Sequence, residues 1–412
     1  MDKINIQRKI KILFLPAFSC HDKVAHAGGQ TCNYYLNNFY QDSDFEIGFA
    51  VISIDTNTDY INMKTQYKLA KDFSIIIKAH SLKRYYYSLI SRIYSHFLAY
   101  SNSKWLITSL IYKDFIKKTV KNVKKVWYPD LVILDWTQVN LWAKIVKKSL
   151  PKSKIISFEQ DVSFLRINRK YPTKKKVQET FKSEEIKALE FADLVIVSNQ
   201  KDKSALLPYI NESKIRVIHP YYHAYGKLNQ DFDKRNGILF FGAMGRLENI
   251  EAVEYFLNEV FPFLKNKFQI KFYCVGGGIT EELKNKYKAE NIEFTGYISD
   301  PSEYFDRSFC MIAPLLHGAG IKVKVLEGMA SGLPVVTNDV GIEGIPALDK
   351  YHYMHCNSKE EYINTIDELF ENKKKCTFYS KNAITFIREN FDLTQSCNEY
   401  KKDILDLLFG GK

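Results

Sequence analysis

Short apolar runs recur along the chain and alternate with stretches in which apolar residues follow helical spacing. The first run, IKILFL at Ile10–Leu15, ends at Pro16 and predicts a buried strand. Helical spacing then appears around Cys32, Leu36 and Phe39. Further runs in the first half lie at Ile47–Ile52, Leu131–Leu134, Ile155–Phe158 and Leu194–Val197. This alternation predicts an α/β fold, with a parallel sheet that helices cover on both faces.

A second series of the same kind follows the polar region 219–236, which is marked by proline and tyrosine. Its predicted strands are Gly237–Phe241, Ile270–Val275, Ile292–Thr295, Met311–Ala313 and Pro334–Thr337. A chain of 412 residues is also too long for one ordinary core. We therefore predict a domain at 1–222, a second domain at 223–392 and a helical tail within 393–412.

Glycine is concentrated in the second predicted domain. Thirteen of the 19 glycines lie between Gly237 and Gly344, mainly where predicted strands end. Ligands of open α/β sheets bind outside the carboxyl ends of strands, where glycine lets the backbone approach them. The second domain is therefore the predicted ligand binder.

Composition narrows the class of protein. Hydrophobic residues make up 46% and charged residues 26%, as in globular proteins. The first apolar run is too short for a signal peptide, and we find no run of about 18 apolar residues that would predict a membrane span. The seven cysteines are scattered without a CxxC pair, and the histidines have no metal-ligand spacing. We predict a cytoplasmic protein that binds no metal.

Positive charge is concentrated between His80 and Tyr128. This stretch has ten basic residues and one acid, so it carries +9 of the net charge of +12, and it is rich in aromatic residues. One interpretation is peripheral contact with the anionic inner face of the cell membrane. The other is a set of amphipathic helices whose lysines are simply solvated. We find no nucleic-acid-binding motif.

The stretch Ala313–Ile345 predicts a strand, a Gly-Ala-Gly loop and a helix that begins near Val323 and is ended by Gly332. Backbone N–H groups at such a helix start bind anions, and Lys322 adds a positive charge suited to a diphosphate. Glu327 is suited to accept hydrogen bonds from ribose hydroxyls. The alternative is a plain strand–loop–helix in which Lys324 and Glu327 form a pair.

The segment GAGIKVKVLEGMASGLPVV, followed by GIEG, resembles the retaining glycosyltransferases of family four (glycosyl transferases group 1). The stretches GILFFGAMGRLENIEAVEYF and FYCVGGG agree with it, as does the stretch 294–322 from FTGYISD to YFDRSFCMIAPLLHGAGIK. HAGGQTCNYYL and SFEQDVSFLR extend it loosely to the first half. The resemblance implies the GT-B architecture, in which two Rossmann-like domains face each other across a cleft. The N-terminal domain would bind the acceptor, the C-terminal domain would bind a nucleotide-sugar donor, and the final helix would cross back to the N-terminal domain. It implies no cofactor.

Carried over residue by residue, the resemblance assigns Arg246 and Lys322 to the donor diphosphate, Glu327 to the ribose and the backbone at Tyr297 and Ile298 to the nucleobase. The remaining predicted donor-site residues are Gly28, Gly29, Gly245, His317, Gly318, Ala319 and Gly320. For Arg246 the alternative is a surface arginine that pairs with Glu248.

One departure concerns the donor sugar. The family often has a second glutamate eight positions before the one at Glu327, and this chain has Ala319 there. His317 or the Gly318–Gly320 amides would then contact the sugar. Asp161, after the predicted strand KIISF, is our candidate for acceptor or leaving-group chemistry. In the resembled enzymes the departing phosphate assists deprotonation of the acceptor, so that a protein nucleophile is not required.

The predicted function is transfer of a sugar, such as a hexose, from a nucleoside-diphosphate donor to a glycan or lipid-linked acceptor in bacterial surface polysaccharide synthesis. Two alternatives stay open. One is a GT-B nucleotide-sugar epimerase, and the other is a non-catalytic GT-B-like binding protein.

Overall fold

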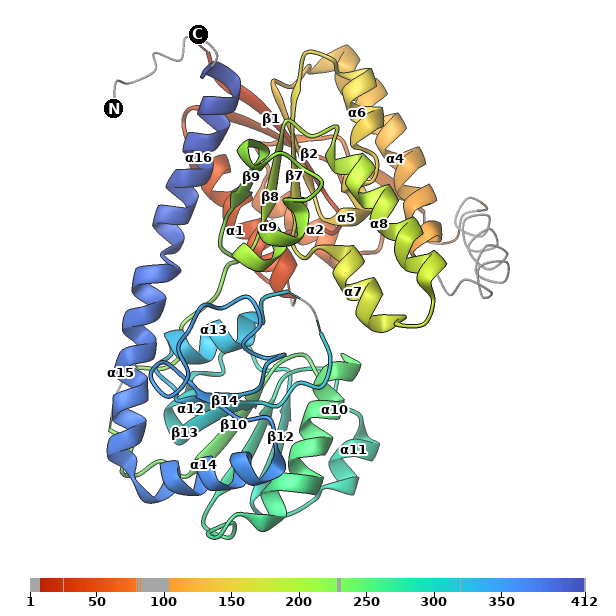
Figure 1. Cartoon of the computed structure of the whole chain (residues 1–412). Coiled ribbons are helices and arrows are strands. Elements are labelled where there is room, and N and C mark those ends of the chain that lie inside the picture. The colour runs from red at the N-terminus through yellow and green to blue at the C-terminus, as the bar shows by residue number, and fades with distance from the viewer. Residues whose placement is uncertain are drawn as a thin grey trace. The chain divides into compact units, whose positions relative to one another are not determined.

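The computed structural model describes residues 8–410 except 25, 79, 81, 83–103, 228–230 and 319, and only the backbone of 104–111. Most of the basic region 80–103 and the predicted site residue Ala319 therefore lie outside the described residues. The chain divides into two compact units (Figure 1). Unit 1 comprises 1–220 and 394–412, and unit 2 comprises 221–393.

The main sheet of unit 1 is parallel throughout. Its strands, in spatial order, are β4 (Lys71–Asp72), β2 (Phe45–Phe49), β1 (Ile10–Pro16), β6 (Leu131–Asp135), β7 (Lys154–Glu159), β8 (Leu194–Val197) and β9 (Ile215–Val217). The order runs outward in both directions from β1, and Ile12 pairs with Ile47 on one side and with Leu131 on the other. A topological switch point therefore lies between β1 and β6, where doubly wound sheets bind ligands.

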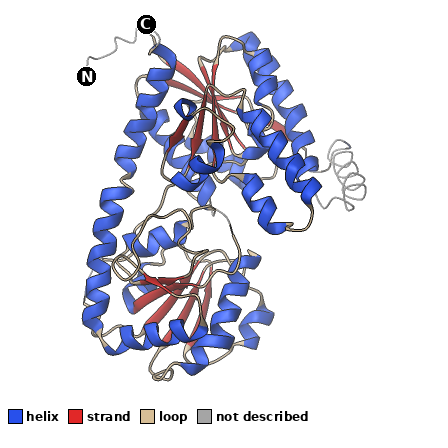
Figure 2. Ribbon diagram, in the orientation of Figure 1, coloured by secondary structure: helices blue, strands red, loops and turns tan. Residues whose placement is uncertain are grey.

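Helices cover both faces of this sheet (Figure 2). Ile12 and Phe14 of β1 are buried in one apolar cluster, whereas Leu13 and Leu15 are buried in the other, as the two-residue period of a strand requires. The first cluster includes residues of α1 (Ala27–Gln41), α2 (Thr58–Gln66) and α16 (Leu393–Phe409). The second includes residues of α4 (Lys104–Val126), α5 (Thr137–Asn140), α6 (Ala143–Ser149), α7 (Ser163–Lys170), α8 (Lys175–Leu189) and α9 (Gln200–Leu206).

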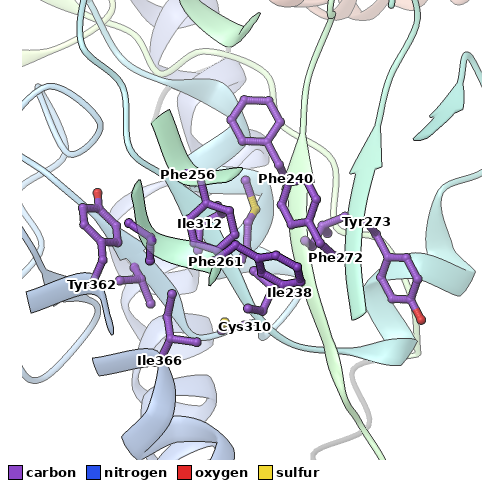
Figure 3. Packing of buried hydrophobic residues seen from close by; sticks show 14 of the residues in the cluster. Ile238, Phe240, Phe256, Phe261, Phe272, Tyr273, Cys310, Ile312, Tyr362 and Ile366 are labelled. Carbon is purple, nitrogen blue, oxygen red and sulfur yellow. The ribbon is translucent and has the colours of Figure 1, made fainter. Parts of the chain in front are cut away.

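Unit 2 repeats this plan. Its parallel strands, in spatial order, are β12 (Ile292–Gly296), β11 (Lys271–Val275), β10 (Gly237–Phe241), β13 (Ser308–Ala313), β14 (Val335–Thr337) and β15 (Met354–His355). The helices of unit 2 are α10 (Leu247–Tyr255), α11 (Glu281–Lys286), α12 (Ser302–Arg307), α13 (Val323–Ala330), α14 (Lys359–Glu371) and α15 (Lys373–Asn390). Ile238 and Phe240 of β10 lie in the core with Phe272 of β11 and Ile312 of β13 (Figure 3). The switch point of this sheet lies between β10 and β13.

The predicted strands are all present, although several bounds differ by a few residues, as at β13, which begins at Ser308 and not at Met311. The run predicted as one strand at Ile47–Ile52 is divided, because β2 ends at Phe49 and β3 (Ile52–Ile54) pairs with β5 (Ile75–Ile77) in a separate small sheet. The short strands β4, β5, β9 and β15 were not predicted, since two or three residues carry too little pattern to detect.

The helix α16 packs against the rest of unit 1, from which it is distant in sequence. Its Tyr400 and Ile404 are buried, and the Tyr400 ring contacts those of Tyr35 and Phe39 at centroid distances of 5.4 and 5.1 Å. The Tyr35 hydroxyl also lies 2.9 Å from the Ser396 hydroxyl. Among the described residues, no helix is long and apolar enough to cross a membrane.

Candidate functional site

Two glycine-containing loops lie at the switch point of unit 2. The loop 242–246 follows β10, and the loop 314–322 follows β13 and leads into α13. Gly242 has φ +154, and a Cβ there would lie 2.8 Å from the Lys324 Nζ. Gly318 has φ +144, and a Cβ there would lie 2.8 Å from the Lys322 Cε. The positive φ favours glycine at both positions, whereas the two lysine ends are flexible and could move away from an added Cβ.

The loop after β11 lies directly against the loop after β10. A Cβ at Gly276 would be 1.9 Å from the Gly242 carbonyl oxygen, and one at Gly278 would be 2.5 Å from the Gly245 nitrogen. A Cβ at Gly245 itself would meet no atom within 4 Å. The two backbones are thus in close contact, while Gly245 has open space at its Cβ position.

Two lysines meet at this switch point. Lys322 precedes α13, and its Nζ donates to the Gly320 carbonyl at 2.7 Å and lies 3.6 Å from Glu343 Oε2. The Lys324 Nζ donates to Asn249 Oδ1 and lies 4.7 Å from the centre of the Phe240 ring.

The surroundings of Lys324 disfavour the charged form of its side chain. Burial, together with the nearby positive charges of Arg246 and Lys322, lowers the pKa of Lys324 to about 7. Lys324 therefore lies close enough to Arg246 and Lys322 to be repelled by both. A bound anion would relieve this repulsion.

Arg246 lies as its alternative interpretation predicts, as a surface arginine that pairs with Glu248. Its side chain is 66% exposed and pairs with Glu248 in the first turn of α10. The positive charge nevertheless acts on Lys324. The guanidinium is therefore near the switch point and exposed to solvent there.

Glu327 lies on the buried side of α13, with an exposed fraction of 6%. Its carboxyl receives hydrogen bonds from the His223 backbone N–H and the Tyr225 hydroxyl, and burial raises its pKa to about 8. The Tyr225 N–H donates to the Ser331 hydroxyl at 2.8 Å. The described contacts of Glu327 are thus to the segment that begins unit 2 rather than an ion pair with Lys324.

The other predicted residues of unit 2 lie around this point. Tyr297 is 72% exposed and its Cβ is 3.1 Å from the Cβ position of Gly277, whereas Ile298 packs partly against the core. His317 is 74% exposed, with Nε2 3.9 Å from Glu251 Oε2. Gly320 has φ +68, a conformation that favours glycine.

Gly28 and Gly29 lie at the switch point of unit 1, in the first turn of α1. A Cβ at Gly28 would lie 2.0 Å from Cζ3 of Trp136, the residue after β6, which has φ +90. The Trp136 ring contacts the rings of Phe18 and His26. The His26 Nδ1 accepts from the Gly29 N–H at 2.9 Å and caps the helix. Close packing against the Trp136 ring therefore explains why glycine stands at position 28, without reference to a ligand.

Asp161 lies beside a buried acid network that follows β7. Asp161 Oδ2 is 3.2 Å from Arg166 Nη1, and Arg166 Nη2 donates to the Ser163 hydroxyl at 3.3 Å. The Ser163 and Thr137 hydroxyls lie 2.8 Å apart, and Thr137 donates to Glu159. These contacts connect Asp161 to the fully buried Glu159.

A second buried acid, Glu185 of α8, supports the same network. Its two carboxyl oxygens accept the N–H groups of Ser163 and Phe164 at 2.8 Å each, and so cap α7. Burial raises the pKa of Glu185 to about 8. Burial and the Glu185 charge raise the pKa of Glu159 well above its usual value.

The structure thus gathers the predicted residues into two sets, one at each switch point. Arg246, Lys322 and the loop glycines 245, 318 and 320 lie around the switch point of unit 2. Gly28 and Gly29 lie at that of unit 1, and Asp161 follows β7 of the same sheet. Sequence reasoning considered Lys324 only as a partner of Glu327 and did not single out Glu185, since the partners that the structure gives them are distant in the chain. Within the part of the chain that is described, no group of three or more His, Cys, Asp or Glu residues is arranged to hold a metal.

Comparisons with known proteins match part of the chain to a glycosyltransferase family and almost the whole chain to one fold. Residues 235–372 match the family described as Glycosyl transferases group 1. An uncharacterised protein in the cps region of Klebsiella pneumoniae is 29% identical over 204 residues, which span 47% of this chain and half (50%) of that protein. An uncharacterised glycosyltransferase of Methanocaldococcus jannaschii is 24% identical over 278 residues, 62% of this chain and 69% of the relative.

Similar solved structures extend over almost the whole chain. Anabaena HepE in complex with UDP-glucose matches with a TM-score of 0.65 and 13% identity, over 96% of this chain and 99% of HepE. Sucrose-phosphate synthase of Thermosynechococcus elongatus matches with a TM-score of 0.72 and 13% identity, over 98% and 100%. At such identities the likeness concerns the fold, which is that of GT-B glycosyltransferases. The chain therefore has the GT-B fold, and its residues 235–372 are similar to the glycosyl transferases of group 1.

Proposed function

We propose that this protein transfers a sugar, with retention of configuration, from a nucleoside-diphosphate donor to a glycan or lipid-linked acceptor. The observation that carries the proposal is the convergence of Arg246, Lys322 and Lys324 on glycine loops at the switch point of unit 2. Lysines beside glycine backbone suit a diphosphate, which brings negative charge and needs close approach. HepE, a protein of the same fold, was solved with UDP-glucose.

In the proposed reaction, an acceptor hydroxyl oxygen bonds to the anomeric carbon as the bond from that carbon to the diphosphate oxygen breaks. The hydroxyl proton passes to the departing diphosphate on the same face of the sugar. The electron pair of the broken bond stays on the diphosphate, where Lys322, Lys324 and Arg246 would stabilise it. No protein nucleophile takes part.

The other site residues have roles consistent with this proposal. Glu327 would accept hydrogen bonds from the ribose, and the exposed Tyr297 with its neighbour Ile298 would border the nucleobase. His317, Gly318, Ala319 and Gly320 would lie near the donor sugar. Asp161 and its partner Arg166 would contact the acceptor or the leaving group. The Klebsiella relative lies in a cps region, which supports a role in surface polysaccharide synthesis.

The first experiment is thermal unfolding of the full chain with a panel of nucleoside diphosphates and their sugar conjugates. A ligand at 100 times its dissociation constant stabilises the folded state by about 2.7 kcal/mol, which raises the midpoint measurably. We expect one nucleotide series to stabilise the wild type and not Lys322→Ala. Lys374→Ala, an exposed lysine of α15, is the matched control and should respond as the wild type does.

Two alternatives remain to be separated from this function. A nucleotide-sugar epimerase would convert the donor without an acceptor, so product analysis without acceptor distinguishes it. A non-catalytic binding protein would bind the nucleotide without turnover. Absence of any nucleotide-dependent stabilisation would contradict the donor site itself.

A further inference from the structure

Lysines gather on the solvent side of two neighbouring helices of unit 1. The apolar face of α4, with Phe115, Ile116 and Val120, is buried in the core, and α6 packs alongside it (Figure 1). Eight exposed lysines lie on α4, on α6 and in the turn after α6. They are Lys117, Lys118, Lys121, Lys124, Lys125, Lys144, Lys148 and Lys152. We call this set the lysine surface.

Acids do little to neutralise this surface. The single acid of α4, Asp114, pairs with Lys118 at 2.6 Å. The sequence has no acid between Trp136 and Phe158, which covers the whole of α6. Like charges three or four positions apart on a helix repel one another. The fold therefore holds these lysines together at a cost in stability.

The helix α8 of the same unit is the useful comparison, because its solvent side has both signs of charge. There Lys175, Lys176 and Lys187 alternate with Glu179 and Glu184, all of them exposed. An ordinary solvated helix face in this protein is thus mixed. The lysine surface carries almost only positive charge, and binding of an extended anionic partner would explain this.

We propose that the lysine surface docks unit 1 on the anionic face of a lipid bilayer. Long lysine side chains on two helices suit a plane of negative headgroups, because each acts as a mobile point charge. Val126, at the end of α4, is 67% exposed and adds an apolar contact of the kind that an interface accepts. The stretch 104–158, which contains both helices, has no arginine, whereas nucleic-acid sites combine arginine with stacking aromatic residues. This inference does not depend on the proposed sugar transfer.

The test is co-sedimentation of the full chain with vesicles of phosphatidylcholine alone and of phosphatidylcholine with about one third phosphatidylglycerol. We expect binding to the second kind only, weakened by added salt. Each lysine near an anionic surface contributes about fivefold to the partition constant, so four substitutions should lower it by a factor on the order of several hundred. The test variant changes Lys117, Lys121, Lys124 and Lys148 to glutamine.

The matched control changes four exposed lysines of unit 2 to glutamine, with the same loss of net charge. They are Lys271, Lys288, Lys374 and Lys381. The control should bind as the wild type does, and so should a variant with arginine at the four tested positions. Equal thermal midpoints check the folding of all variants, and the pair Lys121→Gln and Lys124→Gln serves if the fourfold variant unfolds.

Three results would overturn the proposal. One is no sedimentation of the wild type with the anionic vesicles. Another is an equal loss of binding in the unit 2 control, which would mean that only net charge matters. The third is tight binding to heparin without vesicle binding at the same ionic strength, which would identify a soluble polyanion as the partner.

Discussion

The two units have the same strand order, but different residues follow the strands near their switch points. In unit 2, burial together with the nearby charges of Arg246 and Lys322 lowers the pKa of Lys324 to about 7. In unit 1 the residues around β6 and β7 include two buried acids, Glu159 and Glu185, whose pKa values are raised. The parallel sheet therefore fixes where a site lies, whereas the residues that follow each strand decide which charge it takes.

The two switch points also differ in the surroundings of their glycines. Gly28 of unit 1 is closed in by the Trp136 ring, whereas Gly245 of unit 2 has open space at its Cβ position. The first glycine serves packing within its unit. The second leaves backbone accessible to a ligand.

The largest effect is expected for Lys324→Met. Loss of a hydrogen-bonding cation should weaken binding of the preferred nucleoside diphosphate by about 10- to 100-fold. The unliganded protein should not lose stability, because methionine is apolar and removes the repulsion with Lys322 and Arg246. Calorimetric titration and thermal unfolding measure the two effects. Equal nucleotide affinity in wild type and variant would remove Lys324 from the site.

The glycine comparison gives the second prediction. Gly28→Ala should lower the free energy of unfolding by about 1–3 kcal/mol, because the new methyl group must displace the Trp136 ring. Gly245→Ala should change it by no more than about 0.5 kcal/mol and should weaken nucleotide binding. Denaturant unfolding and nucleotide titration of both variants test the pair. If Gly245→Ala destabilised the fold and Gly28→Ala did not, the glycine with open space at its Cβ position would be Gly28 of unit 1.

How far the sequence predicts these features depends on where each residue's partners lie. The strands of both sheets are recognisable because their residues are buried on both faces and form unbroken apolar runs. Lys322 and Glu327 belong to one local segment. By contrast, the partner of Lys324 is Asn249, 75 positions away, and Glu185 caps a helix start 22 positions away. Such pairings exist only once the strands are ordered in the sheet.

The buried acids of unit 1 predict a dependence of stability on pH. The raised pKa means that folded Glu159 keeps its proton at pH values where the unfolded chain has lost it. Stability therefore falls as pH rises above about 4.5, by at most about 1.4 kcal/mol per pH unit for this group. Glu159→Gln should flatten the fall above about pH 5, and exposed Glu179→Gln should not. Parallel curves for both variants and the wild type would mean that Glu159 is ionised in the fold.

The smallest effect expected is proton exchange on nucleotide binding at the unit 2 switch point. A diphosphate beside Lys324 favours the charged ammonium, so it raises a pKa that starts at about 7. Binding between about pH 7 and 8 should therefore take up a fraction of a proton. Calorimetric titration in buffers of different ionisation enthalpy measures this fraction.

Glu327, with a pKa of about 8, would release a proton if ribose favours its carboxylate, so it opposes the uptake. We expect Glu327→Gln to increase the measured uptake and Lys324→Met to abolish it. Uptake that survives in Lys324→Met would place the titrating group elsewhere, and would leave the low pKa of this lysine without a role in binding.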